Sequence, residues 1–272
     1  MKIQSHRLIL DDGEAAPFKP TPNISAGRTI DPQYLVIHYT AGASFNSSVN
    51  WLTDPAAQAS AHLVIGREGE IMQLADFNAR TWHAGRSSWR GLSGLNSHSI
   101  GIELDNAGVL DKTAEGWRSA FQKTYPDADG MEAIHKNGGA MRGWHRYTLN
   151  QIEALVAIGA ALVREYGLKD VIGHDDIAPG RKSDPGPAFP MDMGRSRIMG
   201  REDDSEERVE ASAVLNIRSG PGTGFDKIRA PLPKGTGMIV TGESGVWLSV
   251  IVLDGDEPTD TGWVHSHFVA EV

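Results

Sequence analysis

The chain has 272 residues, no cysteine and a formal net charge of −9, from 26 lysine and arginine residues against 35 aspartate and glutamate residues. The acidic balance disfavours nucleic-acid binding, because a protein that follows a phosphate backbone needs a basic face. The lack of cysteine excludes disulfides, thiolate metal sites and a cysteine nucleophile, so any metal must be held by histidine and carboxylate side chains. At ~150 residues per domain, the length predicts about two domains.

No segment has the features of a membrane span or a signal peptide. The longest strongly apolar stretch, 154–163, is about half the length that a membrane span needs. The first ten residues lack an apolar core and are followed by Asp11 and Asp12. We therefore expect no membrane span, and a protein that is either cytoplasmic or released without a signal peptide.

The first 199 residues alternate strand and helix signals. Short apolar runs predict buried strands at 34–38, 62–65, 100–104 and 171–173. A helix is predicted over 149–166 from the 3.6-residue period of its apolar side chains. This alternation predicts an α/β domain. The stretch 111–143 has weak periodicity and many turn formers, and it yields no assignment.

The ends of the predicted helix carry the expected signals. Thr148 and Gln151 have the spacing of a capping box, and Gly167 is a stop signal. Trp144 and Tyr147, just before the helix, are predicted to pack in the core.

A run of charged residues separates this domain from the rest of the chain. It offers no apolar side chain to bury, so we expect a solvated linker over 200–209. Beyond it, glycine and proline turns separate short apolar runs, which predict strands at 214–218, 238–241, 247–253 and 262–264. The predicted organisation is therefore an α/β domain over 1–199, the linker, and a small all-β barrel over 210–272.

Two histidines follow predicted strands and suggest a metal site. His38 closes the first strand and His174 follows the last. In an extended chain Lys182 and Asp184 point the same way. Two imidazoles and one carboxylate would bind zinc and leave a fourth position for water, as in catalytic zinc sites. Asp175 and Asp176 are also candidates for the third ligand. The alternative is that these residues have separate structural roles.

Glu103 lies within an apolar strand. The apolar side chains of 100–104 alternate onto one face, which leaves Glu103 on the other face beside Gly101. A carboxylate in such a strand is costly unless it is used. The alternative is an outer face in contact with solvent.

Five motifs, taken in order, resemble the zinc-dependent N-acetylmuramoyl-L-alanine amidases over roughly residues 20 to 190. They are IHYTAG at 37–42, SAH at 60–62, WHAG at 82–85, SIGIE at 99–103 and GHDDIAPGRKSDPGP at 173–187. The resemblance implies a mixed central β-sheet flanked by helices. It also implies hydrolysis of the amide bond between N-acetylmuramic acid and L-alanine in peptidoglycan or muropeptides.

The same resemblance assigns roles to the residues that match the motifs. It implies that His38, His174 and Asp184 hold one Zn²⁺ ion, that Glu103 activates the attacking water, and that Lys182 stabilises the oxyanion. Some members have a tyrosine where this chain has Ala61, and this difference favours the arrangement found in AmpD-like members.

Further residues match positions that line the substrate cleft of that family. These are Trp82, His83 and Asn96, and His62 is a candidate for the cleft or for a supporting position. Each also fits a structural role, because a tryptophan is more often part of a core and a histidine often supports a turn.

The C-terminal part resembles a bacterial SH3 domain. The match is carried by LNIRSGPG at 215–222 and GWVH at 262–265. It implies contact with cell-wall peptide, which would hold the catalytic domain near its polymer. The alternative is a barrel that only stabilises its neighbour.

Two rival functions follow from the same residues. One is a recognition protein that binds peptidoglycan without cutting it, and the other is a zinc peptidase that cuts within the stem peptide. All three metal ligands, Glu103 and Lys182 are present, which favours an enzyme.

Overall fold

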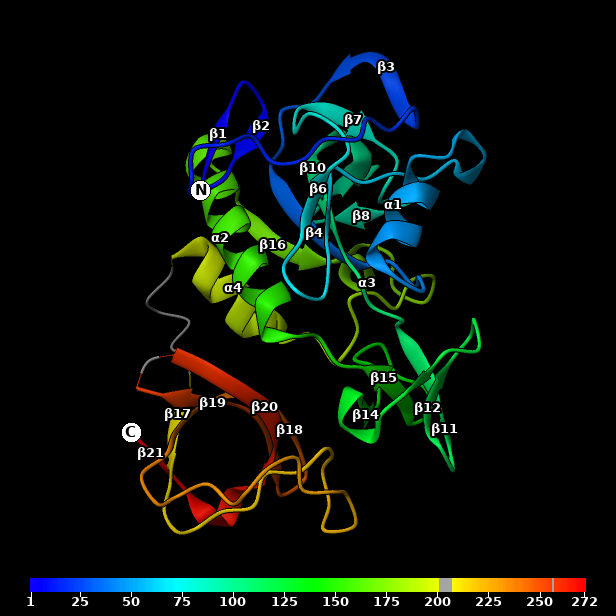
Figure 1. Ribbon diagram of the computed structural model, residues 1–272. Coiled ribbons are helices and arrows are strands. Elements are labelled where there is room, and N and C mark those ends of the chain that lie inside the picture. Colours follow the sequence, from blue (N-terminus) through cyan, green and yellow to red (C-terminus); the bar gives the residue numbers. More distant parts are fainter. Residues whose placement is uncertain (201–206, 256) are drawn as a thin grey trace.

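The computed structural model describes residues 1–200, 207–255 and 257–272 (Figure 1). It contains an α/β unit built on a five-stranded sheet, a second five-stranded sheet beside it, and an all-β unit at the C-terminal end. The predicted fold class, a mixed sheet flanked by helices and followed by a small all-β barrel, is confirmed. No helix in the described ranges has both the length and the apolar composition of a membrane span.

The central sheet has the strand order β16-β4-β10-β5-β6. Strands β16, β4, β10 and β5 run parallel, and β6 pairs antiparallel with β5. Their bounds are β4 Tyr34–Tyr39, β5 Leu63–Ile65, β6 Ile71–Gln73, β10 Ser99–Leu104 and β16 Asp170–Gly173. All four strands predicted for this region are therefore present. Because the parallel strands end at one edge, the polar residues at the ends of β4, β10 and β16 meet there.

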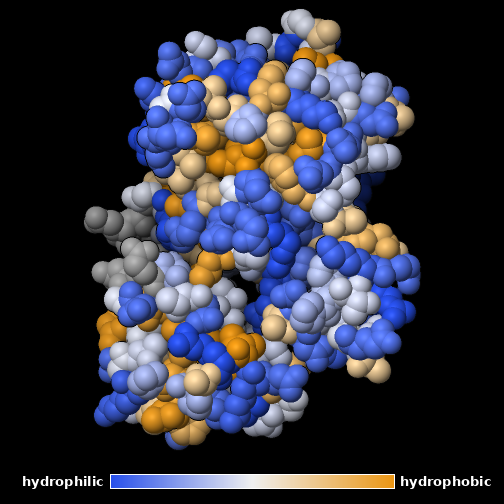
Figure 2. Space-filling view, viewed as in Figure 1, coloured by the Kyte–Doolittle hydropathy of each residue, from blue (hydrophilic) through white to orange (hydrophobic). Residues whose placement is uncertain are grey.

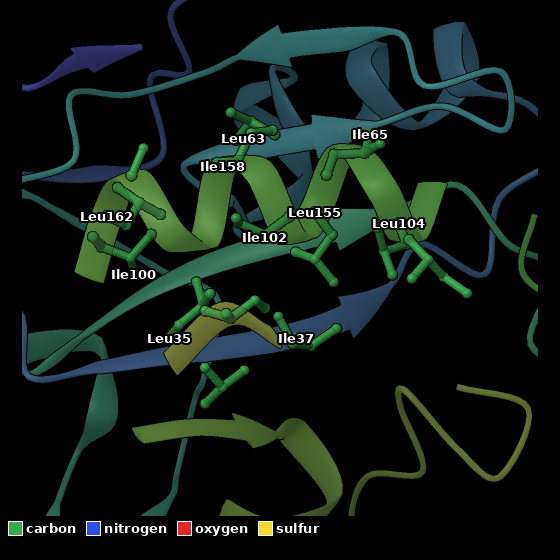
Figure 3. Packing of buried hydrophobic residues seen from close by; sticks show 14 of the residues in the cluster. Leu35, Ile37, Leu63, Ile65, Ile100, Ile102, Leu104, Leu155, Ile158 and Leu162 are labelled. Carbon is green, nitrogen blue, oxygen red and sulfur yellow. The ribbon is translucent and has the colours of Figure 1, made fainter. Parts of the chain in front are cut away.

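Helix α2 covers one face of this sheet. It runs over Leu149–Tyr166 as predicted, begins with the Thr148–Gln151 capping box, and ends at Gly167 in the left-handed conformation. Figure 3 shows its apolar side chains lying across the strands, where one cluster includes Leu35, Ile37, Leu63, Ile65, Ile100, Ile102, Leu104, Leu155, Ile158 and Leu162. Side chains alternate along a strand, so His38 and Glu103 belong to the opposite face.

Three further helices complete the α/β unit. Helix α1 (Phe45–Leu52) packs Val49 and Leu52 on the face opposite α2 (Figure 1). Helix α4 (Met191–Met199) lies beside α2, and the short α3 (His174–Ile177) directly follows β16. The position of α3 brings His174 to the edge where β4 ends.

Short peripheral elements surround this unit. Strands β1 and β2 form a hairpin, β3 pairs with β7, and β8 pairs with β9. Their bounds are β1 Lys2–Gln4, β2 Arg7–Ile9, β3 Ile24–Thr29, β7 Ala79–Thr81, β8 Ser88–Trp89 and β9 Leu92–Ser93. Single 3₁₀ turns occur at Pro55–Ala57, Leu95–Ser97, Asp127–Asp129 and Ser266–Phe268.

The stretch that yielded no assignment forms most of a second sheet with the order β13-β12-β11-β15-β14. Its strands are β11 Val109–Thr113, β12 Gly116–Ser119, β13 Thr124–Tyr125, β14 Gly130–Ala133 and β15 Arg142–His145, all antiparallel. Trp117 is buried at its centre, and Trp144 and Tyr147 are buried as predicted. This sheet packs against the segment that follows α3.

The C-terminal unit is an antiparallel sheet with the order β20-β19-β18-β17-β21. Its bounds are β17 Arg208–Ala211, β18 Gly237–Ser244, β19 Trp247–Asp254, β20 Glu257–His265 and β21 Val269–Glu271. The strand predicted at 214–218 is wrong, because this segment makes only isolated bridges from Leu215 and Arg218. Most of the predicted linker, 201–206, lies outside the described residues, and β17 begins at Arg208.

The barrel packs on both other units. Ile239, Ile251 and Leu253 share an apolar cluster with α2 and α4, and Trp263 packs with Met131 and Trp144 of the second sheet. A cavity of about 380 Å³ remains between the barrel and this sheet, and Figure 2 shows the surface hollowed there.

Candidate metal centre

Three side chains that are distant in sequence meet at the carboxyl edge of the central sheet. His38 lies near the end of β4, His174 begins α3, and Asp184 lies in the loop beyond α3. Their side chains are buried. The atoms His38 Nδ1, His174 Nδ1 and Asp184 Oδ2 are each 2.9 Å from the other two.

The second nitrogen of each imidazole determines what these three atoms can do. His174 Nε2 lies 3.2 Å from the carbonyl oxygen of Ala84, which only accepts, and 3.5 Å from Arg181 Nη2. The closer contact assigns the proton to Nε2. His83 Nε2 likewise faces the carbonyl oxygen of Ser99 at 3.3 Å, so its Nδ1 accepts from His38 Nε2 at 3.0 Å. The Nδ1 atoms of His38 and His174 therefore both keep a lone pair.

Three lone pairs thus converge with no proton between them. Burial, followed by the neighbouring His174, lowers the pKa of His38 to about 4, so the ring is neutral at pH 7. Burial also holds the pKa of His83 well below its usual value. Two imidazole lone pairs and one carboxylate that converge in this way fit a divalent cation, and the three residues form a group that could hold a metal ion.

The other two candidates for the third ligand do not join this group. The Asp175 carboxylate contacts His135 and Lys136, and the Asp176 carboxylate accepts from the Gly173 backbone N–H and from Lys136. Only Asp184 brings a carboxylate oxygen to both histidines within the described part of the chain.

Glu103 lies beside the group on the neighbouring strand. In the β10–β4 register it is directly opposite His38. Its Oε2 atom is buried and has no hydrogen-bond partner among the described residues. Burial, with the nearby Asp184 carboxylate adding to it and Lys182 opposing it, raises the pKa of Glu103 to about 8. This carboxyl group is therefore free to exchange a proton near neutral pH.

A cavity of about 330 Å³ opens onto these groups. Lys182 lines it together with Glu103 and the three converging residues, so the structure brings all five predicted metal and catalytic residues together. The Lys182 side chain is also exposed to solvent.

The four predicted substrate residues divide into two pairs. Trp82 and His83 line the cavity. Asn96 is buried behind it and its Oδ1 accepts from the Ala84 backbone N–H at 2.7 Å, while His62 is fully buried and accepts from the Gly101 N–H at 3.0 Å. Neither of this second pair is among the cavity-lining residues. Their contacts place them as supports of the cavity wall.

Gly101 explains how the wall is built. A Cβ atom at this position would lie 2.4 Å from the His83 ring, so only glycine lets His83 pack over β10 and reach His38.

Sequence reasoning missed several residues that line the cavity, among them Trp51, Tyr39 and Arg181. Trp51, at the end of α1, is 59% exposed, although its ring borders the site. Tyr39 contacts Ser183 through its hydroxyl at 2.7 Å, and Arg181 donates to the carbonyls of Ala84 and Arg86. Arg181 lies inside a quoted motif and could have been found there, whereas Trp51 carries no local signal.

Comparison with known proteins places both parts of the chain. Residues 28–187 match the family described as N-acetylmuramoyl-L-alanine amidase, and residues 213–270 match the bacterial SH3 domain. The chain is 34% identical to the N-acetylmuramoyl-L-alanine amidase AmiD of Escherichia coli over 63% of its own length and 55% of that protein. It is 30% identical to the 1,6-anhydro-N-acetylmuramyl-L-alanine amidase AmpD of Citrobacter freundii, over 71% of this chain and 95% of that protein.

The chain is also similar to solved structures of AmpD and AmiD. A crystal structure of an AmpD derivative has 28% identity and a TM-score of 0.47, and covers 70% of this chain and 94% of that chain. A complex of AmiD from E. coli with anhydro-N-acetylmuramic acid-L-Ala-D-γ-Glu-L-Lys has 32% identity and a TM-score of 0.45, and covers 67% and 62%. The chain spans little more than half the length of the E. coli AmiD and AmpD proteins that it matches. Because the matched family covers more than half of this chain, the chain belongs to the N-acetylmuramoyl-L-alanine amidase family.

Proposed function

We propose that this protein is a zinc-dependent enzyme that hydrolyses the amide bond between N-acetylmuramic acid and L-alanine in peptidoglycan or in muropeptides. The observation that carries the proposal is the convergence of the His38, His174 and Asp184 lone pairs beside the buried Glu103 Oε2 atom, which has no hydrogen-bond partner in the described part of the chain. Family membership and the names of the relatives support it.

His38, His174 and Asp184 are assigned as the ligands of one Zn²⁺ ion. A zinc ion held there would lower the pKa of bound water to about 7 and polarise the scissile carbonyl group. The histidine pair is prepared for this role, because the hydrogen bonds of His38 to His83 and of His174 to Ala84 orient both rings.

Glu103 is assigned as the general base and acid. Its raised pKa lies close to neutrality, so the carboxyl group can take a proton from the attacking water and return it to the leaving amine. Because Oε2 has no partner among the described residues, no hydrogen bond has to break before it acts.

Lys182 is assigned to the oxyanion. Lys182 lines the cavity beside the ligands, where negative charge would develop on the carbonyl oxygen. A well-placed donor of this kind contributes about 3 kcal/mol to the transition state. Trp82 and His83 are assigned to the cavity wall that meets the substrate, with Asn96 and His62 supporting it.

We also propose that the chain consists of a catalytic domain over 1–199, a linker over 200–209 and an SH3-like barrel over 210–272. The SH3-like barrel would bind cell-wall material and so raise the local concentration of amide bonds at the catalytic domain. Its packing on α2 and on the second sheet would keep both surfaces on one body.

Digestion of purified peptidoglycan and of a defined muropeptide, with mass-spectrometric product analysis, tests the proposal. We expect the zinc-loaded protein to release peptides that begin with a free L-alanine amine, and the matched Asp184→Ala variant to release none. Products cut within the stem peptide would indicate a peptidase instead. No cleavage by protein that binds zinc would contradict the proposal in favour of a recognition protein.

A further inference from the structure

A loop of the second sheet reaches the segment that carries His174. This loop, residues 134–141, connects β14 to β15 and presents His135, Lys136 and Asn137 to helix α3. All three of these residues contact Asp175, which directly follows His174 in the chain. None of the three loop residues lines the cavity beside the candidate metal centre.

All three loop residues contact Asp175. His135 Nδ1 accepts from the Asn137 backbone N–H at 3.1 Å, so its Nε2 carries the proton and donates to Asp175 Oδ2 at 3.0 Å. The Lys136 Nζ atom lies 2.8 Å from Asp175 Oδ1 and 2.7 Å from Asp176 Oδ1. Asn137 Nδ2 donates to the Asp175 carbonyl oxygen at 3.0 Å. The carboxylate and the backbone of Asp175 are therefore both held.

Asp175 is in turn connected to the other ligand segment. Its backbone N–H donates to the Asp184 carbonyl oxygen at 2.8 Å. There is no spare room around this link, since a Cβ atom at Gly173 would lie 2.2 Å from Asp175 Oδ1 and 2.8 Å from Pro185. A shift of Asp175 would therefore change how His174 and Asp184 face each other.

Burial makes these contacts matter. The Asp175 side chain is 3% exposed. A buried carboxylate that loses its cation is driven toward solvent. Such a movement acts on the peptide unit next to His174.

The start of the loop packs against the second sheet. The His135 ring packs 5.7 Å from Trp144, and Trp144 packs with Met131 against Trp263 of the barrel. The loop therefore extends from a sheet that is held between the ligand segment and the barrel.

We propose that His135, Lys136 and Asn137 are positioning residues that hold α3 so that His174 can share a metal ion with His38 and Asp184. The inference rests on the proposed zinc centre. It gives the second sheet a function in metal affinity, through contacts that do not reach substrate.

Zinc affinity tests the proposal directly. The dissociation constant of the full-length protein for Zn²⁺ is measured by competition with a chromogenic chelator at neutral pH, for the wild type and for Lys136→Met. We expect the variant to bind zinc more weakly by a factor of roughly 10 to 100, the range for residues that orient metal ligands. The matched control is Lys112→Met, which removes an ion pair with Asp127 in the same sheet. We expect it to leave zinc affinity unchanged.

The melting temperature of the metal-free protein separates positioning from a general loss of stability. A lower melting temperature with a zinc affinity within about twofold of the wild type would overturn the proposal. If Lys136→Met does not fold, Asn137→Ala removes one hydrogen bond to the Asp175 backbone and should weaken zinc binding by a smaller factor. A wild-type protein that binds no zinc would overturn the proposed centre and this inference together. Zinc binding by the wild type with no response in any loop variant would overturn this inference alone.

Discussion

Two clusters of histidine and carboxylate side chains lie on either side of the peptide bond between His174 and Asp175. In one, His38, His174 and Asp184 turn three lone pairs toward one another. In the other, the Asp175 carboxylate is matched by a histidine N–H and a lysine ammonium of the 134–141 loop.

The difference separates a binding site from a support. In the cluster around Asp175, the carboxylate forms an ion pair with the protein's own cation, Lys136. In the cluster around Asp184, no proton lies between the three atoms that carry the lone pairs. A cation is the species that would stabilise this arrangement. Histidine and aspartate alone do not distinguish the two, because both clusters contain them. The lysine ammonium and the hydrogen-bond direction at each ring nitrogen do.

The largest effect should come from removing the charge of the unsatisfied cluster. Asp184→Asn keeps the size of the side chain but loses the anionic ligand. We expect amidase activity to fall to background, by a factor of at least ~1,000, with loss of stoichiometric zinc. Metal content and product release on a soluble muropeptide measure both. Retained zinc at wild-type affinity would show that Asp184 is not a ligand.

Glu103 belongs to neither cluster and should separate metal binding from proton transfer. We expect Glu103→Gln to bind zinc as the wild type does and to lose activity by a factor of roughly 100 to 10,000, because the amide cannot carry the proton. Zinc titration and turnover on the same preparation check this. A fully active variant would remove Glu103 from the mechanism.

The sequence predicted the first cluster better than the second for a physical reason. His38, Glu103 and His174 stand in or directly after apolar strands, and the alternation of such strands predicts a parallel sheet that gathers them at one edge. Spacing alone could not choose among Asp175, Asp176 and Asp184. That choice depends on the 134–141 loop, which engages two of the three carboxylates from outside the motif.

The second sheet could not be predicted because its glycines serve packing. Gly130 and Gly143, which read as turn formers, lie in β14 and β15, where a Cβ atom would lie 2.2 Å and 2.4 Å from the Trp117 indole. The strands of this sheet are two to five residues long, which is too short for their hydrophobic alternation to be detected in the sequence. A short apolar run also misled the prediction in the barrel. The segment 214–218 forms isolated bridges but no strand.

In the metal-free protein, the free energy of unfolding should depend on pH through the Glu103 carboxyl group. The pKa of Glu103 is about 8 in the folded protein against 4.5 as its ordinary value. Between pH 6.5 and 8 the folded state therefore holds a proton that the unfolded state has lost, and stability falls as pH rises. The buried His38, with a pKa of about 4, adds stability only as pH rises to 6.5 and is constant above it.

The expected loss across this window is at most about 2 kcal/mol. Chemical denaturation of chelator-treated protein at several pH values measures it, and Glu103→Gln should remove the slope. The same slope in both proteins would assign the titration to another group.

The smallest effect should come from the cavity wall, outside both clusters. Trp51 borders the cavity yet is 59% exposed, and α1 is held to the sheet by Val49 and Leu52. Trp51→Ala should therefore fold normally and bind zinc normally. Because an aromatic contact is worth about 1 kcal/mol, we expect KM for a soluble muropeptide to rise by about fivefold with kcat unchanged. Trp51→Phe should recover most of the loss. An altered zinc affinity would instead connect α1 to the metal cluster, and an unchanged KM would mean that substrate does not reach this wall.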